Sequence, residues 1–573
     1  MNLLDSLFIG PHGENKEFLK DIWQDLLERT LQYREETFAE DGLLPIEAPG
    51  EQRYQVVKDG IEQFFSILAK EVPTFSNRYL GHMISDVSIP ALVGNIAMLF
   101  CNPNLASKET AEAGVVFETR AINTLAKMIG FEEAPARGHF TSGGTLANFE
   151  ALWRARYRMD HWLAMAAYLI EKGHTKKNLF ELAHQGWDSF HQYAEEFDIE
   201  MEHLRERSYV MQGPWDIANY YREKLNLEFP QPVILVPGNK HYSWPKSANV
   251  FGISERAIWP TELDRHGRIE IKSLRANIER ARKLGHPIMM NVSVTGTTEL
   301  GSVDPVDEIN EVLRDYRENQ GIHIWHHIDA AYGGYFCSTF RGGKTQLDER
   351  TARAFTAISQ VDSVTLDPHK LGYVPYACGA FLVRESESYA VSHISAPYLQ
   401  AQPDIEYPTW STTLEGSRPA TGAGAVWLSS CVLPLDASGH GELLNQSLTA
   451  KAHFADRLQQ SFPDIQLTPG SDTNIISFTL VGKEKSLRKI NERTSAILDK
   501  FTHSPNFAVT RTSLSLKNYR EMISSVVERW DGIIDDDHLL VVRMVIMGPY
   551  LQDNDANDRL IDKFIEELRK FSE

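Results

Sequence analysis

Short apolar segments separated by helical patterns are the feature that most constrains how this chain can fold. The segments are rich in β-branched residues and mostly continuous in their apolar character rather than alternating, which is typical of parallel strands buried on both faces of a sheet. The predicted strands are 233–236, 288–294, 322–329, 361–366 and 379–383, with predicted helices such as 146–173 and 269–284 between them. This alternation predicts a large wound α/β domain with a mostly parallel sheet over residues 85–395.

Two further parts flank this domain. Apolar residues recur at helical spacing over residues 16–38, which predicts a helix with one wide apolar face that lies on another subunit or on the main body. We therefore expect residues 1–84 to form an N-terminal helical segment that packs on a partner subunit. Residues 396–573 are expected to form a mobile loop and a small α+β domain, with strands at 473–481, 507–513 and 539–547 and a closing helix at 558–571. The charged stretch 171–228 is predicted to be a helical insertion whose role is not assigned.

Composition excludes several classes of function. The formal net charge of −20, from 58 basic and 78 acidic residues, argues against a nucleic-acid or anionic-membrane partner. The four cysteines have no CxxC spacing, so we expect neither a disulfide framework nor a zinc site. No basic region precedes the first apolar stretch, and no apolar run approaches the ~18 residues of a membrane span. We expect a cytoplasmic protein that is not bound to a membrane.

Two strand ends carry the groups that suggest chemistry. The segment 363–370 ends in Asp367, His369 and Lys370, and the segment 322–329 ends in Asp329. A lysine amine forms a Schiff base with the aldehyde of pyridoxal 5′-phosphate (PLP), and a carboxylate keeps the pyridine nitrogen protonated. Alone, Lys370 reads as a surface lysine and Asp329 as a residue that caps a turn. Together they favour a PLP site.

A glycine-containing turn before the helix at 146–173 is a candidate phosphate site. Gly143 and Gly144 let backbone amides approach an anion, the helix N-terminus adds partial positive charge, and Thr145 offers a hydroxyl. The alternative is an ordinary helix start. The turn lacks the lysine of a Walker loop, so we do not expect a nucleoside triphosphate. His241, after the strand 233–236, could stack on the cofactor ring.

The cluster of His323, His326 and His327 invites comparison with a metal site. Neighbouring residues on a strand point to opposite faces, so His326 and His327 would not converge on one ion. We predict no metal site.

Five segments occur in the order found in group II PLP-dependent amino-acid decarboxylases: 141–148, 241–244, 296–305, 329–334 and 367–370. The chain resembles this family, and bacterial tyrosine decarboxylases within it through 78–83, 102–104, 414–417 and 432–435. The resemblance implies the PLP-dependent transferase fold of type I. It also implies a homodimer with active sites at the interface.

The resemblance implies roles for individual residues. Lys370 would bind PLP covalently, Asp329 would pair with the pyridine nitrogen, and His241 and Ala331 would face the two sides of the ring. Asp367 and His369 would complete the cofactor-binding set, together with the phosphate-binding residues Gly143, Gly144 and Thr145.

Two further roles concern the substrate. His82 would lie in the substrate pocket, near Ser85. Tyr398 would be the mobile-loop tyrosine that returns a proton to the α-carbon after carbon dioxide leaves.

We expect the enzyme to convert an aromatic L-amino acid such as tyrosine to its amine and carbon dioxide. Val545 departs from tyrosine decarboxylases, which carry a small hydroxyl residue near this position. An acidic substrate, glutamate or aspartate, is therefore the alternative, for which the nearby cations are Arg78, Lys108 and Arg418. A PLP-dependent carbon–carbon lyase acting on a phosphorylated amino alcohol, and a scaffold without catalysis, are the remaining alternatives.

Overall fold

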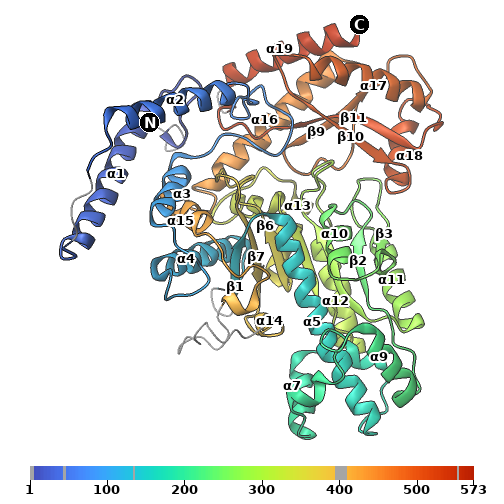
Figure 1. Ribbon diagram of the computed structural model, residues 1–573. Coiled ribbons are helices and arrows are strands. Elements are labelled where there is room, and N and C mark those ends of the chain that lie inside the picture. The colour runs from blue at the N-terminus through green and yellow to red at the C-terminus, as the bar shows by residue number, and fades with distance from the viewer. Residues whose placement is uncertain (1–5, 43–46, 133–135, 394–408, 552–553) are drawn as a thin grey trace.

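Two β-sheets organise the protein (Figure 1). The computed structural model describes residues 6–42, 47–132, 136–393, 409–551 and 554–573. The first sheet has seven strands in the order β1-β7-β6-β5-β4-β2-β3, and the second has four in the order β10-β11-β9-β8. The strands of the first sheet are β1 (Arg137–Thr141), β2 (Val233–Pro237), β3 (Ile258–Thr261), β4 (Ile288–Val294), β5 (His326–Ala330), β6 (Ser363–Leu366) and β7 (Gly379–Val383).

The first sheet is mostly parallel, as predicted. Strands β3, β2, β4, β5 and β6 run parallel to one another, whereas β7 is antiparallel to both β6 and β1. The prediction that 379–383 is one more parallel strand was therefore wrong. A parallel connection needs a crossover, usually a helix, but the chain between β6 and β7, residues 367–378 with Lys370, contains no helix. The strand predicted at 322–329 begins only at His326, and β1 and β3 were not predicted.

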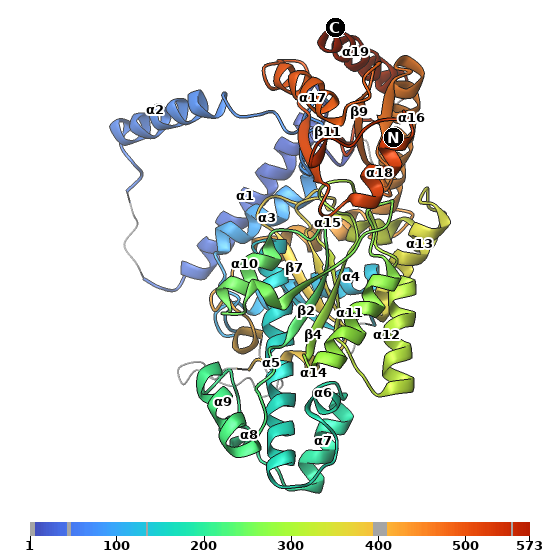
Figure 2. The ribbon, with the colours of Figure 1, turned by 90° about the vertical axis from the view of Figure 1, so that its right-hand side faces the viewer.

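Helices cover both faces of this sheet (Figure 2). Side chains of successive residues on β2 point to opposite faces of the sheet. Ile234 and Val236 pack in one apolar cluster with α5 (Gly144–Glu171), and Val233 and Leu235 pack in another with α11 (Ile271–Leu284) and α12 (Val306–Gln320). The helices predicted at 146–173 and 269–284 are thus confirmed to within a few residues.

The predicted helical insertion at 171–228 is confirmed. It consists of α6 (Leu179–Ala183), α7 (Trp187–Glu196), α8 (Met201–Arg205), α9 (Pro214–Tyr220) and a π-helical turn (Tyr221–Leu225). These elements surround the C-terminal end of α5, at the bottom of Figure 1. Arg207 joins them to α5 through Glu171, with its Nη2 2.6 Å from the carboxylate.

The second sheet is antiparallel and lies at the opposite end of the molecule from the insertion (Figure 1). Its strands are β8 (Ile465–Leu467), β9 (Ile475–Leu480), β10 (Thr510–Ser515) and β11 (His538–Val545), with α17 (Leu487–Thr502), α18 (Arg520–Glu528) and α19 (Asn554–Ser572). The three predicted strands and the closing helix are confirmed with shifted ends, and β8 was not predicted. Before this sheet, α15 (Thr421–Val432) packs on α3 (Ile89–Cys101) and α4 (Glu112–Ile129), and α16 (His440–Ser461) leads into the second sheet.

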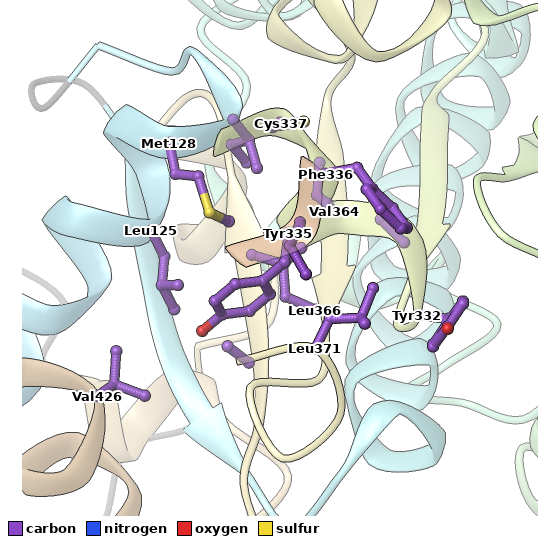
Figure 3. Close-up of a cluster of buried hydrophobic side chains, with 14 of the residues drawn as sticks. Leu125, Met128, Tyr332, Tyr335, Phe336, Cys337, Val364, Leu366, Leu371 and Val426 are labelled. Atoms are coloured by element: carbon purple, nitrogen blue, oxygen red, sulfur yellow. The ribbon is translucent and has the colours of Figure 1, made fainter. Parts of the chain in front are cut away.

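A large apolar core lies under the turns that follow β5 and β6 (Figure 3). The 3₁₀ segment Gly333–Thr339 comes directly after β5, and its Tyr335, Phe336 and Cys337 are buried. Leu371, next to Lys370, is fully buried in the same cluster. Interiors of this kind are close-packed, so the backbone on either side of Asp329 and Lys370 is held firmly.

Two N-terminal helices stand apart from this core. Neither α1 (Lys16–Phe38) nor α2 (Glu51–Leu68) contains a buried residue, and α2 projects from the body (Figure 2). The helix predicted at 16–38 is confirmed, whereas α2 was not predicted. Both helices present large apolar side chains to solvent, among them Phe18, Trp23, Phe64 and Phe65. Within the described parts of the chain, no helix combines the length and apolarity that crossing a membrane requires.

Candidate active site

The carboxyl ends of β2, β4, β5 and β6 meet the N-terminus of α5 around a cavity of about 420 Å³. Ligands of wound α/β proteins bind at this edge of the sheet. The structure brings together in the cavity lining all nine residues predicted to bind the cofactor: Gly143, Gly144, Thr145, His241, Asp329, Ala331, Asp367, His369 and Lys370.

Lys370 lies in the turn after β6 and is paired with Asp367. The backbone N–H of Lys370 donates to the Asp367 carbonyl over 2.9 Å, and its Nζ lies 2.9 Å from Asp367 Oδ2. Burial lowers the pKa of the Lys370 amine, but the carboxylates of Asp367 and Asp329 outweigh that effect and raise it above its usual value. The amine is therefore held as an ammonium, and it must lose a proton before it can attack an aldehyde.

Asp329 is the last charged residue of β5, and only 4% of it is exposed. Its Oδ2 accepts a hydrogen bond of 2.8 Å from Nδ2 of Asn148, and its Oδ1 accepts one of 3.3 Å from the N–H of Ala331. These two donors fix the orientation of the Asp329 carboxyl group, and a carboxylate is the partner that a pyridinium nitrogen needs.

The N-terminus of α5 lies against the Lys370 turn. A Cβ on Gly144 would stand 2.9 Å from Asp367 Oδ2 and 3.0 Å from the Ala331 Cβ, so only glycine allows this approach. The first backbone N–H groups of a helix have no partner within the helix, and the dipole of α5, 28 residues long, favours an anion beside them. With the hydroxyl of Thr145, this is a suitable site for a phosphate ester.

Two histidines complete the cavity wall. His241 Nδ1 lies 2.9 Å from Ser243 Oγ. The His369 ring stacks on Tyr376, with centroids 3.9 Å apart, and its Nδ1 accepts a 3.1 Å hydrogen bond from the N–H of Cys378. Burial lowers the pKa of both imidazoles, so both are neutral near pH 7.

One predicted residue, His82, is not in this assembly, and another lies outside the described residues. His82 is exposed, lies 3.2 Å from an Nη2 of Arg543 and is not among the cavity residues. Tyr398 lies outside the described residues. Conversely, Asn148 has no predicted role, yet it contacts Asp329. Its position four residues after Gly144, and so on the same face of α5, was the available signal.

The three clustered histidines are engaged in hydrogen bonds. His326 lies 2.9 Å from Ser293 Oγ and 2.8 Å from Asn310 Oδ1, His327 lies 2.8 Å from Ser363 Oγ, and His323 lies 3.1 Å from Arg158. Burial lowers their pKa values to about 4, 3 and 4 respectively. In the described parts of the chain, the residues with metal-like spacing are instead Asp536, Asp537 and His538, in and just before β11.

The donor set fits PLP. One buried oxygen of Asp367, Oδ1, has no hydrogen-bond partner in the described structure and so invites a ligand. Lys370 offers the amine, Asp329 the carboxylate and α5 the anion site. The cavity volume is in the range of cofactor pockets.

Comparison with known proteins defines the class. Residues 222–480 match the family described as the pyridoxal-dependent decarboxylase conserved domain. The segment includes Asp329 and Lys370. The protein is a PLP-dependent amino-acid decarboxylase.

Within that class, the chain is similar over nearly its whole length to L-tyrosine decarboxylases. That of Enterococcus faecium is 28% identical, covering 100% of this chain and 98% of its own. That of Levilactobacillus brevis is 27% identical, covering 97% of this chain and 94% of its own.

Solved structures share the fold. Mouse CSAD in its apo form has a TM-score of 0.66 at 19% identity, covering 92% of this chain and 90% of its own. Oryza sativa TDC, solved with PLP and tryptamine, also has a TM-score of 0.66, at 13% identity, covering 96% and 98%. The predicted type I fold, with its mostly parallel sheet, is confirmed.

Proposed function

We propose that this enzyme removes the carboxyl group of an aromatic L-amino acid, with tyrosine as the first candidate, and releases the amine and carbon dioxide. The observation that carries the proposal is one cavity holding Lys370 and Asp329 in a chain that aligns end to end with L-tyrosine decarboxylases.

In this proposal the chain's own groups hold and orient the reactants. Lys370 would hold the cofactor aldehyde, Asp329 would hold its ring nitrogen, and His241 and Ala331 would contact the ring. Gly143, Gly144 and Thr145 bind the phosphate, with His369 beside them. Bound PLP supplies the electron sink that makes loss of carbon dioxide feasible.

Proton movement is assigned to two residues. Asp367, 2.9 Å from the Lys370 amine, stabilises the proton that Lys370 carries whenever its amine is free. Tyr398 supplies the proton that returns to the α-carbon. The latter role rests on the resemblance to tyrosine decarboxylases alone.

The acidic-substrate alternative finds no cation other than Lys370 among the described residues of the site. Aspartate 1-decarboxylase of Aliivibrio fischeri is 26% identical, covering 73% of this chain and 66% of its own. Among the described residues lining the cavity, however, Lys370 is the sole lysine or arginine. Arg78 and Lys108 are exposed elsewhere, and the buried Arg418 is paired with Glu118. The same lack of cations disfavours a phosphorylated lyase substrate.

Val545, which stands where tyrosine decarboxylases carry a small hydroxyl residue, does not reverse the preference for an aromatic over an acidic substrate. Val545 is buried in the main core, in the same cluster as Tyr332, and does not line the cavity. Val545 therefore leaves tyrosine as one candidate substrate among the aromatic amino acids.

We also propose a cytoplasmic homodimer with active sites at the interface, and the domain division at residues 84 and 395. The exposed apolar faces of α1 and α2, with Phe18, Trp23, Phe64 and Phe65, support the homodimer, because such faces mark interfaces. Gel filtration of the PLP-loaded protein tests it. A fully active monomer would refute it.

The substrate is tested by incubating the PLP-loaded protein with each of the twenty amino acids and measuring carbon dioxide and amine. We expect release from tyrosine or another aromatic amino acid. Release from aspartate or glutamate alone would select the alternative substrate, and no release from any would refute the proposal.

A further inference from the structure

A chain of buried hydrogen bonds runs behind the cavity and ends on two of its walls. Trp325 Nε1 donates to Ser363 Oγ over 2.8 Å, and Ser363 Oγ lies 2.8 Å from His327 Nδ1. His327 Nε2 lies 3.3 Å from Asn148 Oδ1. All four residues are at most 2% exposed. In the low dielectric of a buried site, hydrogen bonds are strong, and a polar group without a partner destabilises the fold.

The direction of these bonds follows from both ends of the chain. At one end, an indole N–H only donates, so Ser363 Oγ accepts from Trp325 and can donate its own hydrogen to His327 Nδ1. At the other end, the Asn148 amide nitrogen faces Asp329, so its oxygen faces His327 Nε2. Burial lowers the pKa of His327 to about 3, so the ring is neutral, its one N–H is on Nε2, and Nδ1 accepts from Ser363. That N–H faces the Oδ1 of Asn148, with Thr365 Oγ1 a second neighbour at 3.3 Å.

Asn148 is the branch point. With its oxygen facing His327, its amide hydrogens point to Asp329 Oδ2 at 2.8 Å and Ser243 Oγ at 2.9 Å. Ser243 then donates its hydrogen to His241 Nδ1, 2.9 Å away. A neutral His241 therefore carries its proton on Nε2. If the Asn148 amide were flipped, its oxygen would face the Asp329 carboxylate, and two acceptors would meet with no hydrogen between them.

We propose that Asn148 is a positioning residue that sets both groups facing the cofactor ring, Asp329 directly and His241 through Ser243. Trp325, Ser363 and His327, which we call the relay, fix the orientation of its amide. The inference rests on the proposed function, because it takes Asp329 and His241 as the residues that contact the ring.

The relay is tested by the affinity for PLP, measured by titration of the visible absorbance of the bound cofactor. Asn148→Ala is expected to weaken binding about tenfold or more, as for loss of a hydrogen bond to a charged group. Ser363→Ala is expected to weaken binding about threefold, although Ser363 does not line the cavity. Ser247→Ala is the matched control, since the buried Ser247 hydroxyl donates to the nearby Trp244 carbonyl and has no other partner among the described residues.

The decisive comparison is the double variant. If Ser363 acts through Asn148, adding Ser363→Ala to Asn148→Ala changes the affinity no further. If the effects of the two substitutions on PLP affinity multiplied in the double variant, the relay would be overturned. An unchanged PLP affinity in Asn148→Ala would overturn it as well. If Asn148→Ala does not fold, Ser363→Ala alone decides, and wild-type affinity in that variant overturns the proposal. A wild-type protein that binds no PLP would instead refute the proposed function.

The tautomer of His241 gives a readout that a merely structural role would not change. In PLP-loaded protein with nitrogen-15 histidine, the His241 signals, assigned by their loss in His241→Gln, should report a proton on Nε2. Ser243→Ala should move population toward the Nδ1 form. A wild-type His241 protonated on Nδ1 would contradict the donor direction from Ser243 to His241.

Discussion

Nζ of Lys370 lies 2.9 Å from Oδ2 of Asp367, three residues earlier in the same turn. The carboxylate stabilises the ammonium in a site where burial alone would destabilise it, and the pKa of Lys370 ends above its usual value. The group that must react as a free amine is thus stored as its conjugate acid.

Replacing this carboxylate should make Lys370 more reactive toward the cofactor. In Asp367→Asn the pKa of the amine falls, because burial is no longer opposed by the adjacent charge. At fixed pH near 8 the neutral fraction rises, so PLP incorporation, followed by stopped-flow absorbance, should be faster, with its pH midpoint shifted to lower pH. Asp315→Asn, on the exposed side of α12, should leave the profile unchanged. A slower reaction in Asp367→Asn would show that the carboxylate serves another purpose.

The close approach of α5 to the Lys370 turn predicts a second effect. In Gly144→Ala the new methyl group meets Asp367 and Ala331 at 2.9 and 3.0 Å, and overpacking of this kind costs about 1–3 kcal/mol. We expect PLP affinity to fall about tenfold or more, because the helix start must move away from the phosphate. Gly186→Ala, where nothing lies within 4 Å, is the control. Equal PLP affinity in both variants would contradict the proposed phosphate site.

Tyr398→Phe should slow amine formation and increase transamination side products, because the α-carbon loses its proton donor. Product analysis by mass spectrometry separates the two outcomes. Tyr193→Phe, on the exposed insertion, should behave as wild type. If Tyr398→Phe released amine at the wild-type rate, the assignment of Tyr398 as the proton donor would be wrong.

Because several histidines are buried in the neutral form, we expect the folded protein to lose stability in acid. His184 Nδ1 donates to the Phe180 carbonyl over 2.7 Å and its Nε2 accepts from the N–H of Ile288 over 2.9 Å, so only the neutral ring fits. Burial lowers the pKa of His184 from 6.5 to about 3. Between these values the unfolded chain binds one more proton than the folded one, so stability falls as pH drops below 6.5, by about 1.4 kcal/mol per pH unit.

Urea unfolding at pH 7.5 and pH 5 measures this loss. The pH dependence should be weaker in His184→Gln, which cannot take up the proton, and unchanged in His503→Gln at an exposed position. An equal pH dependence in His184→Gln and wild type would contradict the argument.

Strands with continuous apolar character were predictable from sequence, and others were not. Strands β2, β4 and β7 were recognised because their residues are nearly all apolar. Strand β1 contains the polar Arg137 and His139 and the strand-disfavouring Gly138, and these residues hide it in the sequence. In the structure, His139 is buried 2.6 Å from the Tyr389 hydroxyl, a partner 250 residues away that sequence alone does not reveal.

The same distinction applies to the site. Lys370, Asp329 and Gly144 lie at or next to the ends of recognisable strands or of a recognisable helix, so local patterns identified them as candidate cofactor-binding residues. The interactions of Asn148 with Ser243 and His327 depend on tertiary contacts between α5, α10 (Ser243–Val250) and β5. Such contacts have no local signature.

Covalent attachment of the cofactor to Lys370 is the central claim. Borohydride reduction of the PLP-loaded protein, followed by proteolysis and mass spectrometry, locates the attachment directly. We predict a single phosphopyridoxyl group on the peptide that contains Lys370, and none in Lys370→Ala. Labelling of another lysine, such as Lys246 on α10, in place of Lys370 would contradict the account.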